Sequence, residues 1–233
     1  MPKLSAQARA RKIKLLLFDV DGVLTDGKLY FVPEAASEGA KEGSNPSHQA
    51  SFEDSPRAAG STPTRTAHEQ IEIKGFHAHD GVASSLCRVA GIKSGLITRR
   101  VSETVARRAR DLRLDHIHQG IQDKRACFEQ VARQEGLKLE EAAFIGDDVV
   151  DLPAMRAAGF AIAVQNARAE VKREAHYVTP HAGGDGALRD AVDFILKSQG
   201  RLQKVLETYL GQHSAQGSSQ LSAVSRQRRS KSR

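Results

Sequence analysis

The stretch that decides the fold lies at residues 13–27 and reads IKLLLFDVDGVLTDG. Its first six residues form a short apolar run, and two acids separated by one residue, Asp19 and Asp21, follow directly. Such a run, closed by Asp and Gly, is typical of a buried parallel strand that enters a tight loop. Two ionised acids at a buried strand end are unfavourable, because they repel each other and lose hydration, unless a cation beside them offsets this cost. The stretch therefore predicts an α/β fold with a divalent metal at the end of its first strand.

Similar apolar runs recur along the chain and alternate with helical patterns. The predicted strands are 92–97, 142–145 and 160–164, and the predicted helices are 82–90, 102–112, 124–136 and 151–158. Strands that alternate with helices predict a doubly wound parallel sheet. In addition, two β-like runs, Lys28–Val32 and Ile71–Phe76, predict a small β-hairpin.

Three segments outside this pattern are polar. Residues 34–70 are rich in Ala, Ser, Glu, Gly and Pro, so we expect a disordered insertion within the hairpin. Residues 1–11 are expected to be a flexible basic segment, and residues 201–233 a largely disordered basic tail. The folded domain is then residues 12–200, interrupted by the insertion.

The net charge of +7 is concentrated at the two ends of the chain. Residues 201–233 hold seven Lys or Arg against one Glu, and residues 1–14 hold five with no acid, which leaves residues 15–200 at −4. A domain of that sign has no electrostatic reason to bind nucleic acid. The basic tail lacks the interleaved aromatic residues that would stack on bases. A nucleic-acid partner is therefore not expected.

Cysteine usage and hydropathy bear on the compartment. The two cysteines, Cys87 and Cys127, both fall in predicted helices, so neither a disulfide framework nor a zinc cluster is expected. Asp19 interrupts the first apolar run before it reaches the length of a signal peptide, and no run is long enough for a membrane span. We expect a cytoplasmic protein.

A second acidic cluster follows the predicted strand at 142–145. It consists of Asp147, Asp148 and Asp151. Taken alone, each acidic cluster has a plainer interpretation, as an Asp-rich turn or as the capped start of a helix. Because the carboxyl ends of parallel strands meet at one edge of a sheet, the two clusters together predict a shared metal site.

Two residues between the acidic clusters are suited to bind phosphate. Thr98 follows the predicted strand at 92–97, and Lys124 begins a predicted helix. A hydroxyl at a strand end and a lysine at a helix start can both reach phosphate oxygens. Seen alone, Lys124 would be an ordinary surface lysine, but its order relative to the acidic clusters favours a phosphate ligand.

The order of these elements resembles the four motifs of the haloacid dehalogenase-like hydrolases. Within that family, other stretches resemble the phosphatases of 3-deoxy-D-manno-octulosonate 8-phosphate. The stretches that carry the resemblance are DVDGVLTDG at 19–27, Thr98, Lys124, FHAHDG at 76–81, GDDVVDLP at 146–153 and AGGDGA at 182–187. The resemblance covers about residues 12–200, apart from 34–70.

The resemblance implies a magnesium-dependent phosphomonoesterase that acts on a sugar acid phosphate for lipopolysaccharide-type glycan synthesis. Asp19 would be the nucleophile that forms an aspartyl-phosphate, and Asp21 the general acid and base. Mg²⁺ would be held by Asp19, Asp147 and the backbone carbonyl of Asp21, with Asp148 and Asp151 in support. A hairpin would stand in place of a cap domain, in a homotetramer whose hairpins pair.

The transferring phosphoryl group would be held by Thr98 and Lys124. The chain departs from the family pattern at Arg99, where a small residue is usual, and at His79, where an arginine is frequent. We expect Arg99, together with Arg100 and Asp21, to line the pocket that binds the phosphorylated substrate, or else to point to solvent. Both departures bear on the identity of the substrate more than on the reaction.

Two alternatives to this function stay open. One is the same chemistry on a nine-carbon nonulosonate phosphate, which differs from the eight-carbon substrate in few contacts. The other is a non-catalytic assembly module of the same fold. Such modules have lost their acids, whereas this chain retains both Asp19 and Asp21.

Overall fold

The computed structural model describes residues 4–33 and 70–212. The chain divides into two compact units, one of residues 1–29 with 74–233 and one of residues 30–73. The first unit holds the parallel sheet and its helices, and the second holds the hairpin.

A parallel six-stranded sheet with the order β5-β4-β1-β6-β7-β8 forms the centre of the larger unit. Its strands are β1 Leu15–Phe18, β4 Lys93–Ile97, β5 His116–His118, β6 Ala142–Gly146, β7 Phe160–Ala163 and β8 Tyr177–Val178. From β1 the order runs outward in both directions, so the predicted doubly wound sheet is confirmed. Phe18, at the end of β1, pairs with Leu96 on one side and with Ile145 on the other.

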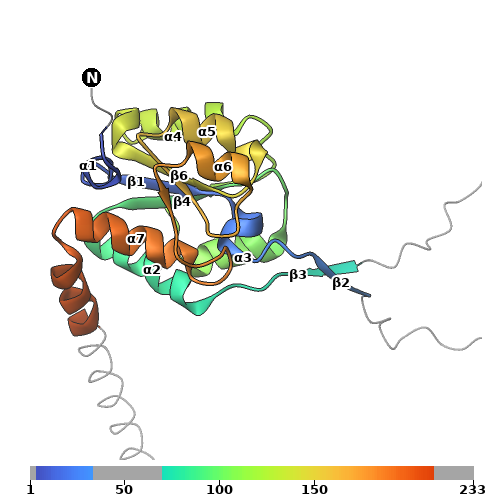
Figure 1. The fold of residues 1–233 in the computed structure, drawn as a ribbon. Helices are drawn as coiled ribbons and strands as arrows, with labels where there is room; N and C mark the ends of the chain where they lie inside the picture. The colour runs from blue at the N-terminus through green and yellow to red at the C-terminus, as the bar shows by residue number, and fades with distance from the viewer. Residues whose placement is uncertain (1–3, 34–69, 213–233) are drawn as a thin grey trace, which may run out of the picture. The chain divides into compact units, whose positions relative to one another are not determined.

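Helices cover both faces of this sheet, with α4, α5 and α6 on one face and α2 and α7 on the other (Figure 1). The helices are α1 Ala6–Ala10, α2 Ala78–Ala90, α3 Glu103–Asp111, α4 Lys124–Gln134, α5 Leu152–Ala157, α6 Ala169–Glu174 and α7 Ala187–Ser198. Single-turn segments lie at Val20–Leu24, Leu139–Glu141 and Val149–Asp151. In the described part of the chain, no helix combines the length and the apolar character needed to cross a bilayer.

The core explains why β1 is a continuous apolar run. All four of its side chains, Leu15 to Phe18, are fully buried, because helices pack on both faces of the sheet. Full burial of each such side chain contributes about 1.5–3 kcal/mol. Phe128 of α4 packs edge-on against Phe144 of β6, with ring centroids 5.9 Å apart. This packing fixes the end of β1, where the acids begin.

The smaller unit is the predicted hairpin. Strand β2, Tyr30–Pro33, pairs antiparallel with β3, Gln70–Ile73, and Tyr30 lies opposite Ile73. Both strands are shorter than the sequence predicted. The insertion predicted at 34–70 lies outside the described residues, except for Gln70 in β3.

The ends of the chain differ from the prediction. Residues 1–11 were expected to be flexible, but Ala6–Ala10 form α1, which Ser5 caps and whose Ala10 is fully buried. A tail was expected from residue 201, but residues 202–212 are helical and Val205 is buried. At the N-terminal end the buried residue is a single alanine, which gives little signal in the sequence. At the C-terminal end Leu202, Leu206 and Tyr209 pack beside Val205 at helical spacing, a pattern that the sequence prediction missed.

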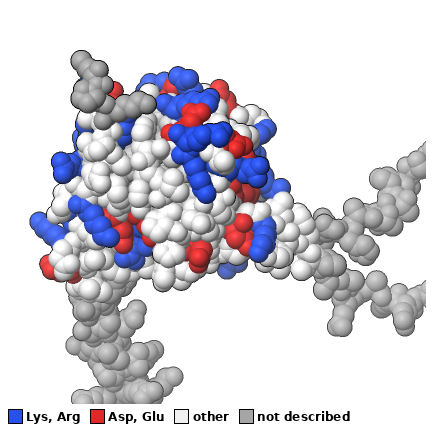
Figure 2. Space-filling view, in the orientation of Figure 1, with Lys and Arg blue, Asp and Glu red and all other residues white. Residues whose placement is uncertain are grey.

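Charges of both signs share the surface. On the face seen in Figure 2, Lys and Arg gather over the region of α4, α5 and α6, with Asp and Glu among them. That face therefore lacks the uniform basic surface of a nucleic-acid-binding protein.

Candidate active site

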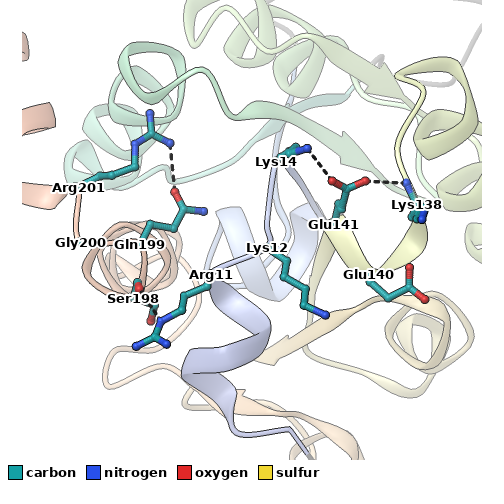
Figure 3. A pocket seen from close by; sticks show the side chains of 10 residues that line it. All are labelled: Arg11, Lys12, Lys14, Lys138, Glu140, Glu141, Ser198, Gln199, Gly200 and Arg201. Atoms are coloured by element: carbon teal, nitrogen blue, oxygen red, sulfur yellow. Dashed lines mark hydrogen bonds and ion pairs between the residues drawn. The ribbon is translucent and has the colours of Figure 1, made fainter.

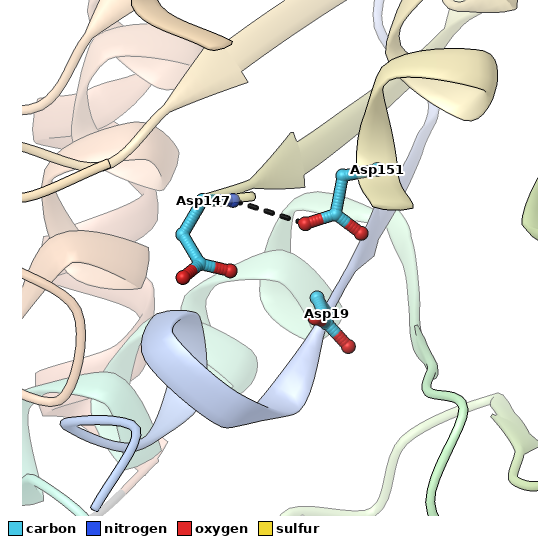
Figure 4. Close-up of side chains that lie close together, drawn as sticks. All are labelled: Asp19, Asp147 and Asp151. Carbon is cyan, nitrogen blue, oxygen red and sulfur yellow. Dashed lines mark hydrogen bonds between the residues drawn. The ribbon is translucent and has the colours of Figure 1, made fainter. Parts of the chain in front are cut away.

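The two acidic clusters meet at the carboxyl edge of the sheet, as the sequence predicted. Strands β1 and β6 are neighbours, so the residues that follow them lie side by side. Asp19, Asp147 and Asp151 place carboxylate oxygens within 4.8 Å of one another (Figure 4). The backbone N–H of Asp147 donates to Asp151 Oδ2 at 3.0 Å, which fixes the second cluster against the sheet.

Two glycines allow the loops of this edge to approach closely. Gly22 has a φ of +87°, and a Cβ there would lie 2.2 Å from Asp147 Oδ2. A Cβ at Gly183 would lie 1.7 Å from the carbonyl oxygen of Gly22. The stretch at 182–187, singled out in the sequence, therefore packs directly on the loop that follows Asp19.

Lys124 lies among the carboxylates. Its ammonium is 2.8 Å from Asp19 Oδ1 and 2.7 Å from Asp151 Oδ1, and its side chain is 1% exposed. Asp123 caps the helix at this point by accepting from the N–H of Ala126 at 2.9 Å. Burial alone would lower the pKa of Lys124, but Asp19 and Asp151 raise it above its ordinary value. The ammonium thus stays charged inside the site.

The carboxylates carry more negative charge than Lys124 can offset. Burial, with the nearby Asp151, raises the pKa of Asp19 to about 6 although Lys124 opposes the shift. Burial, followed by the charges of Asp151 and Asp19, raises the pKa of Asp147 to about 7. A divalent cation would offset the repulsion between these buried carboxylates. Hard divalent cations also favour carboxylate oxygens as ligands.

These shifts predict how stability depends on pH without metal. A carboxyl group whose pKa is higher in the folded than in the unfolded state stabilises the fold fully below its unfolded value, near 3.8. That stabilisation is lost as the pH rises through about 6 for Asp19 and about 7 for Asp147. We expect metal-free protein to lose thermal stability between about pH 4 and pH 7, and Mg²⁺ to restore more of it above that range, at pH 8.

Thermal melting at each pH, with and without Mg²⁺, measures this effect. The variant Asp19→Asn serves as the control, because it lacks one of the two shifted groups and should show a shallower loss. Equal pH dependence in both proteins would contradict the assignment of the shift to Asp19.

A pocket of about 300 Å³ collects the other predicted site residues. Its lining is Asp19, Asp21, Gly27, Thr98, Arg99, Arg100, Lys124, Asp147, Asp148 and Val150. Thr98 is buried at the end of β4, where its N–H donates to the carbonyl of His118 at 2.9 Å. Arg99 donates to Gln122 Oε1 at 2.9 Å. Of the predicted residues, Asp151 alone does not line the pocket, because it is fully buried beside Lys124.

Sequence reasoning missed Lys74. Its side chain is 1% exposed, and its ammonium makes an ion pair with Asp21 Oδ1. Arg100 Nε lies 3.6 Å from the other oxygen, Asp21 Oδ2. The carboxylate of Asp21 is therefore oriented by two cations. The available signal was a lysine that interrupts the β-like run at 71–76.

The stretch at 76–81 lies against the N-terminus of α7. Asp80 is fully buried, and its Oδ1 accepts from the N–H of Arg189 at 3.1 Å. His77 Nε2 is 3.8 Å from Asp185 Oδ1, and the rings of His77 and His79 meet edge-on with centroids 4.6 Å apart. The stretches 76–81 and 182–187, which both carry the family resemblance, therefore meet on this side of the site.

Comparison with known proteins agrees with this geometry. The family model of the haloacid dehalogenase-like hydrolases matches residues 13–159, more than half of the chain. The chain belongs to that family. It is 30% identical to the 3-deoxy-D-manno-octulosonate 8-phosphate phosphatase of Escherichia coli K12 over 197 residues, which cover 84% of this chain and 86% of the relative.

Solved structures resemble the chain along most of its length. The 3-deoxy-D-manno-octulosonate 8-phosphate phosphatase of Yersinia pestis has a TM-score of 0.67 at 30% identity and covers 85% of this chain and 88% of its own. The enzyme of the same name from Moraxella catarrhalis, solved with magnesium, phosphate and KDO, has a TM-score of 0.68 at 32% identity and covers 88% and 97%.

Phosphatases of this family use Mg²⁺, and the residues present here fit that ion. Asp19 and Asp147 line the pocket and offer it carboxylate oxygens, and the carboxylate of Asp151 lies next to them. Mg²⁺ favours such oxygen ligands, and its charge would offset the repulsion that raises both pKa values.

Proposed function

We propose that this phosphatase hydrolyses 3-deoxy-D-manno-octulosonate 8-phosphate to the free sugar acid and inorganic phosphate. The observation that carries the proposal is one pocket lined by Asp19, Asp21, Thr98 and Lys124. These residues supply a nucleophile, an acid and two ligands for the phosphoryl group. The similarity to relatives that bear this substrate in their names supports the choice of substrate.

In the first step, a carboxylate oxygen of Asp19 attacks phosphorus and the bond from phosphorus to the sugar oxygen breaks. Asp21 donates a proton to that oxygen, so that the sugar leaves as an alcohol. Lys124 and Thr98 hold the phosphoryl oxygens. Bound Mg²⁺ would be held by Asp19, Asp147 and the backbone carbonyl of Asp21, and it would neutralise charge on the phosphoryl group.

In the second step, water attacks the phosphorus of the aspartyl-phosphate and Asp21 takes up the proton of that water. The bond between phosphorus and Asp19 breaks, which releases inorganic phosphate and restores the carboxylate. Lys74 and Arg100 orient Asp21 for both proton transfers through the ion pairs described above. Asp148 and Asp151 support the site, the latter by holding Lys124 in place.

The substrate proposal is tested with a panel of sugar phosphates, with and without Mg²⁺. We expect phosphate release to require Mg²⁺ and kcat/KM to be highest for the eight-carbon sugar acid phosphate. Arg99 and Arg100 at the pocket would recognise an anionic substituent of the substrate. A higher kcat/KM for a nine-carbon nonulosonate phosphate would change the proposed substrate but leave the proposed reaction as it is. No release from any member would favour the non-catalytic module.

We also propose that the chain acts as a homotetramer through its hairpin. Tyr30, Phe31, Val32 and Ile73 are each 38–50% exposed, and successive strand residues point to opposite faces. A two-stranded hairpin with apolar side chains on both faces is marginally stable unless another surface covers it. Hairpins of other copies would supply that cover and satisfy the strand edges. We further propose that the chain acts in the cytoplasm, in lipopolysaccharide-type glycan synthesis.

Light scattering tests the assembly. The wild type is expected to have the mass of a tetramer. A variant in which residues 36–68, which lie outside the described residues, are replaced by a short Gly-containing turn should keep both that mass and activity. Phe31→Asp should dissociate the assembly, because it buries a charge at the contact.

Leu210→Asp is the matched control, since Leu210 is 62% exposed and lies outside the hairpin. It should leave the mass unchanged. A fully active wild-type monomer would contradict the proposed assembly. Dissociation of the deletion variant would show that the insertion has a structural role.

A further inference from the structure

A second cavity, of about 1050 Å³, lies at the amino edge of the sheet (Figure 3). Lys14 immediately precedes β1 and Glu141 immediately precedes β6, and both residues line this cavity. The opposite ends of the same two strands carry Asp19 and Asp147. At about 3.3 Å per residue, the run from Lys14 to Asp19 spans about 16 Å. The cavity is therefore separate from the candidate active site.

Basic side chains dominate the lining. Five of its ten residues are Lys or Arg and two are Glu, an excess of three positive charges. The cations are Arg11, Lys12, Lys14, Lys138 and Arg201. They come from three separate parts of the chain, which the fold brings around one hollow (Figure 3). Like charges gathered in a concave surface raise the local concentration of anions.

Two of these cations are fixed by hydrogen bonds to the backbone. Arg11 Nε donates to the carbonyl of Ser198 at 3.1 Å. Arg201 donates to the carbonyl of Ala90 at 2.5 Å and to Gln199 Oε1 at 3.2 Å. A guanidinium has five N–H donors, so each arginine keeps donors for a ligand while its position is held. Such pre-positioned donors lose little entropy when an anion binds.

The lysines complete the cavity. Lys14 makes an ion pair with Glu141 at 2.6 Å. The exposed side chain of Lys12, in contrast, makes no hydrogen bond or ion pair with any described residue. In Figure 3, Lys12 is drawn between Arg11 and Glu140. Its charge is therefore available to a ligand without the loss of an existing contact.

We propose that this cavity binds a small molecule that carries two or more phosphoryl groups. Its volume of about 1050 Å³ is at the upper limit of small-molecule sites, which are about 300–1000 Å³, and exceeds what a single phosphate would fill. Arginine forks and lysine ammoniums are the side chains that bind phosphoryl oxygens. The ten lining residues include no aromatic ring on which a nucleobase could stack, so the anionic groups carry the recognition. The proposal does not depend on the proposed function.

Tripolyphosphate is the probe, titrated calorimetrically into the full-length chain without added Mg²⁺, which the probe would chelate. We expect saturable binding that weakens as salt rises. Lys12→Glu should weaken it about tenfold or more, the effect of losing one charge-assisted contact. Lys204→Glu, which makes the same charge change at an exposed lysine outside the cavity, should bind as the wild type does. Arg99→Gly should also retain binding, because Arg99 belongs to the other pocket.

Three results would overturn the proposal. The first is no saturable binding to the wild type. The second is equal weakening in Lys12→Glu and Lys204→Glu, which would indicate a general effect of charge. The third is binding that is weakened in Arg99→Gly but kept in Lys12→Glu, which would place the probe in the active site. Phosphatase activity of Lys12→Glu should equal that of the wild type, which shows that the variant is folded.

Discussion

Asp19→Asn is expected to abolish phosphate release while the protein stays folded. An amide is a very poor nucleophile toward phosphorus, and it also removes an anionic oxygen from the three-carboxylate cluster. Loss of a nucleophile lowers kcat by roughly 10³-fold or more. The fold should persist, because the side chain keeps its shape and Asp151 still pairs with Lys124 at 2.7 Å.

The stability of metal-free Asp19→Asn should equal or exceed that of the wild type at pH 8. Burial raises the pKa of Asp19 to about 6, so its ionised form destabilises the fold above that pH. Asparagine removes a buried negative charge beside Asp147 and Asp151. Single-turnover phosphate release, thermal melting and circular dichroism measure the two effects.

Asp123→Asn is the matched control for this substitution. The chemical change is the same, the residue lies next to Lys124 but outside the pocket, and asparagine caps a helix as well as aspartate does. Its activity should remain close to that of the wild type. Retained activity in purified Asp19→Asn would instead require another nucleophile.

The sequence was sufficient to predict which candidate residues lie together where they follow strands of the central sheet. The apolar run before Asp19 is typical of a buried strand, and the run before Asp147 has the same character. Parallel strands end at one edge, so the two acidic clusters had to meet there. Thr98 follows the strand that pairs with β1 on the other side, which places it in the same pocket.

Contacts between distant parts of the chain could not be predicted in this way. Lys74 is 53 positions from Asp21, and no local pattern relates the two. Arg9 donates to the carbonyl of Gly159 across 150 positions, and this contact helps to hold α1 on the domain. Strand β8 has only two residues, too few for alternation to be recognised. These elements depend on tertiary packing between distant parts of the chain, which local sequence patterns do not encode.

Lys124→Ala should have a large effect on both activity and stability. The lysine is the cation that lies against Asp19, so its loss removes charge neutralisation from the transferring phosphoryl group. It also leaves Asp19 and Asp151 buried without their partner. Removing one member of a buried ion pair costs about 3–5 kcal/mol. Without metal, this destabilisation should be greatest above pH 7 and should shrink as Asp19 becomes protonated at lower pH.

Arg99→Gly is the comparison variant for Lys124→Ala, because it removes another cation from the same pocket. Arg99 is exposed and donates a hydrogen bond to Gln122 Oε1 on the surface, so its removal should leave stability within about 0.5 kcal/mol. Activity should fall less than in Lys124→Ala, because glycine is close to the small residue that the family pattern has at this position. Initial rates at saturating Mg²⁺ and melting curves at pH 6 and pH 8 rank the two variants. If Arg99→Gly were the more damaging, the principal phosphate cation of this chain would be Arg99, at the end of β4, and Lys124 would serve mainly to neutralise the buried acids.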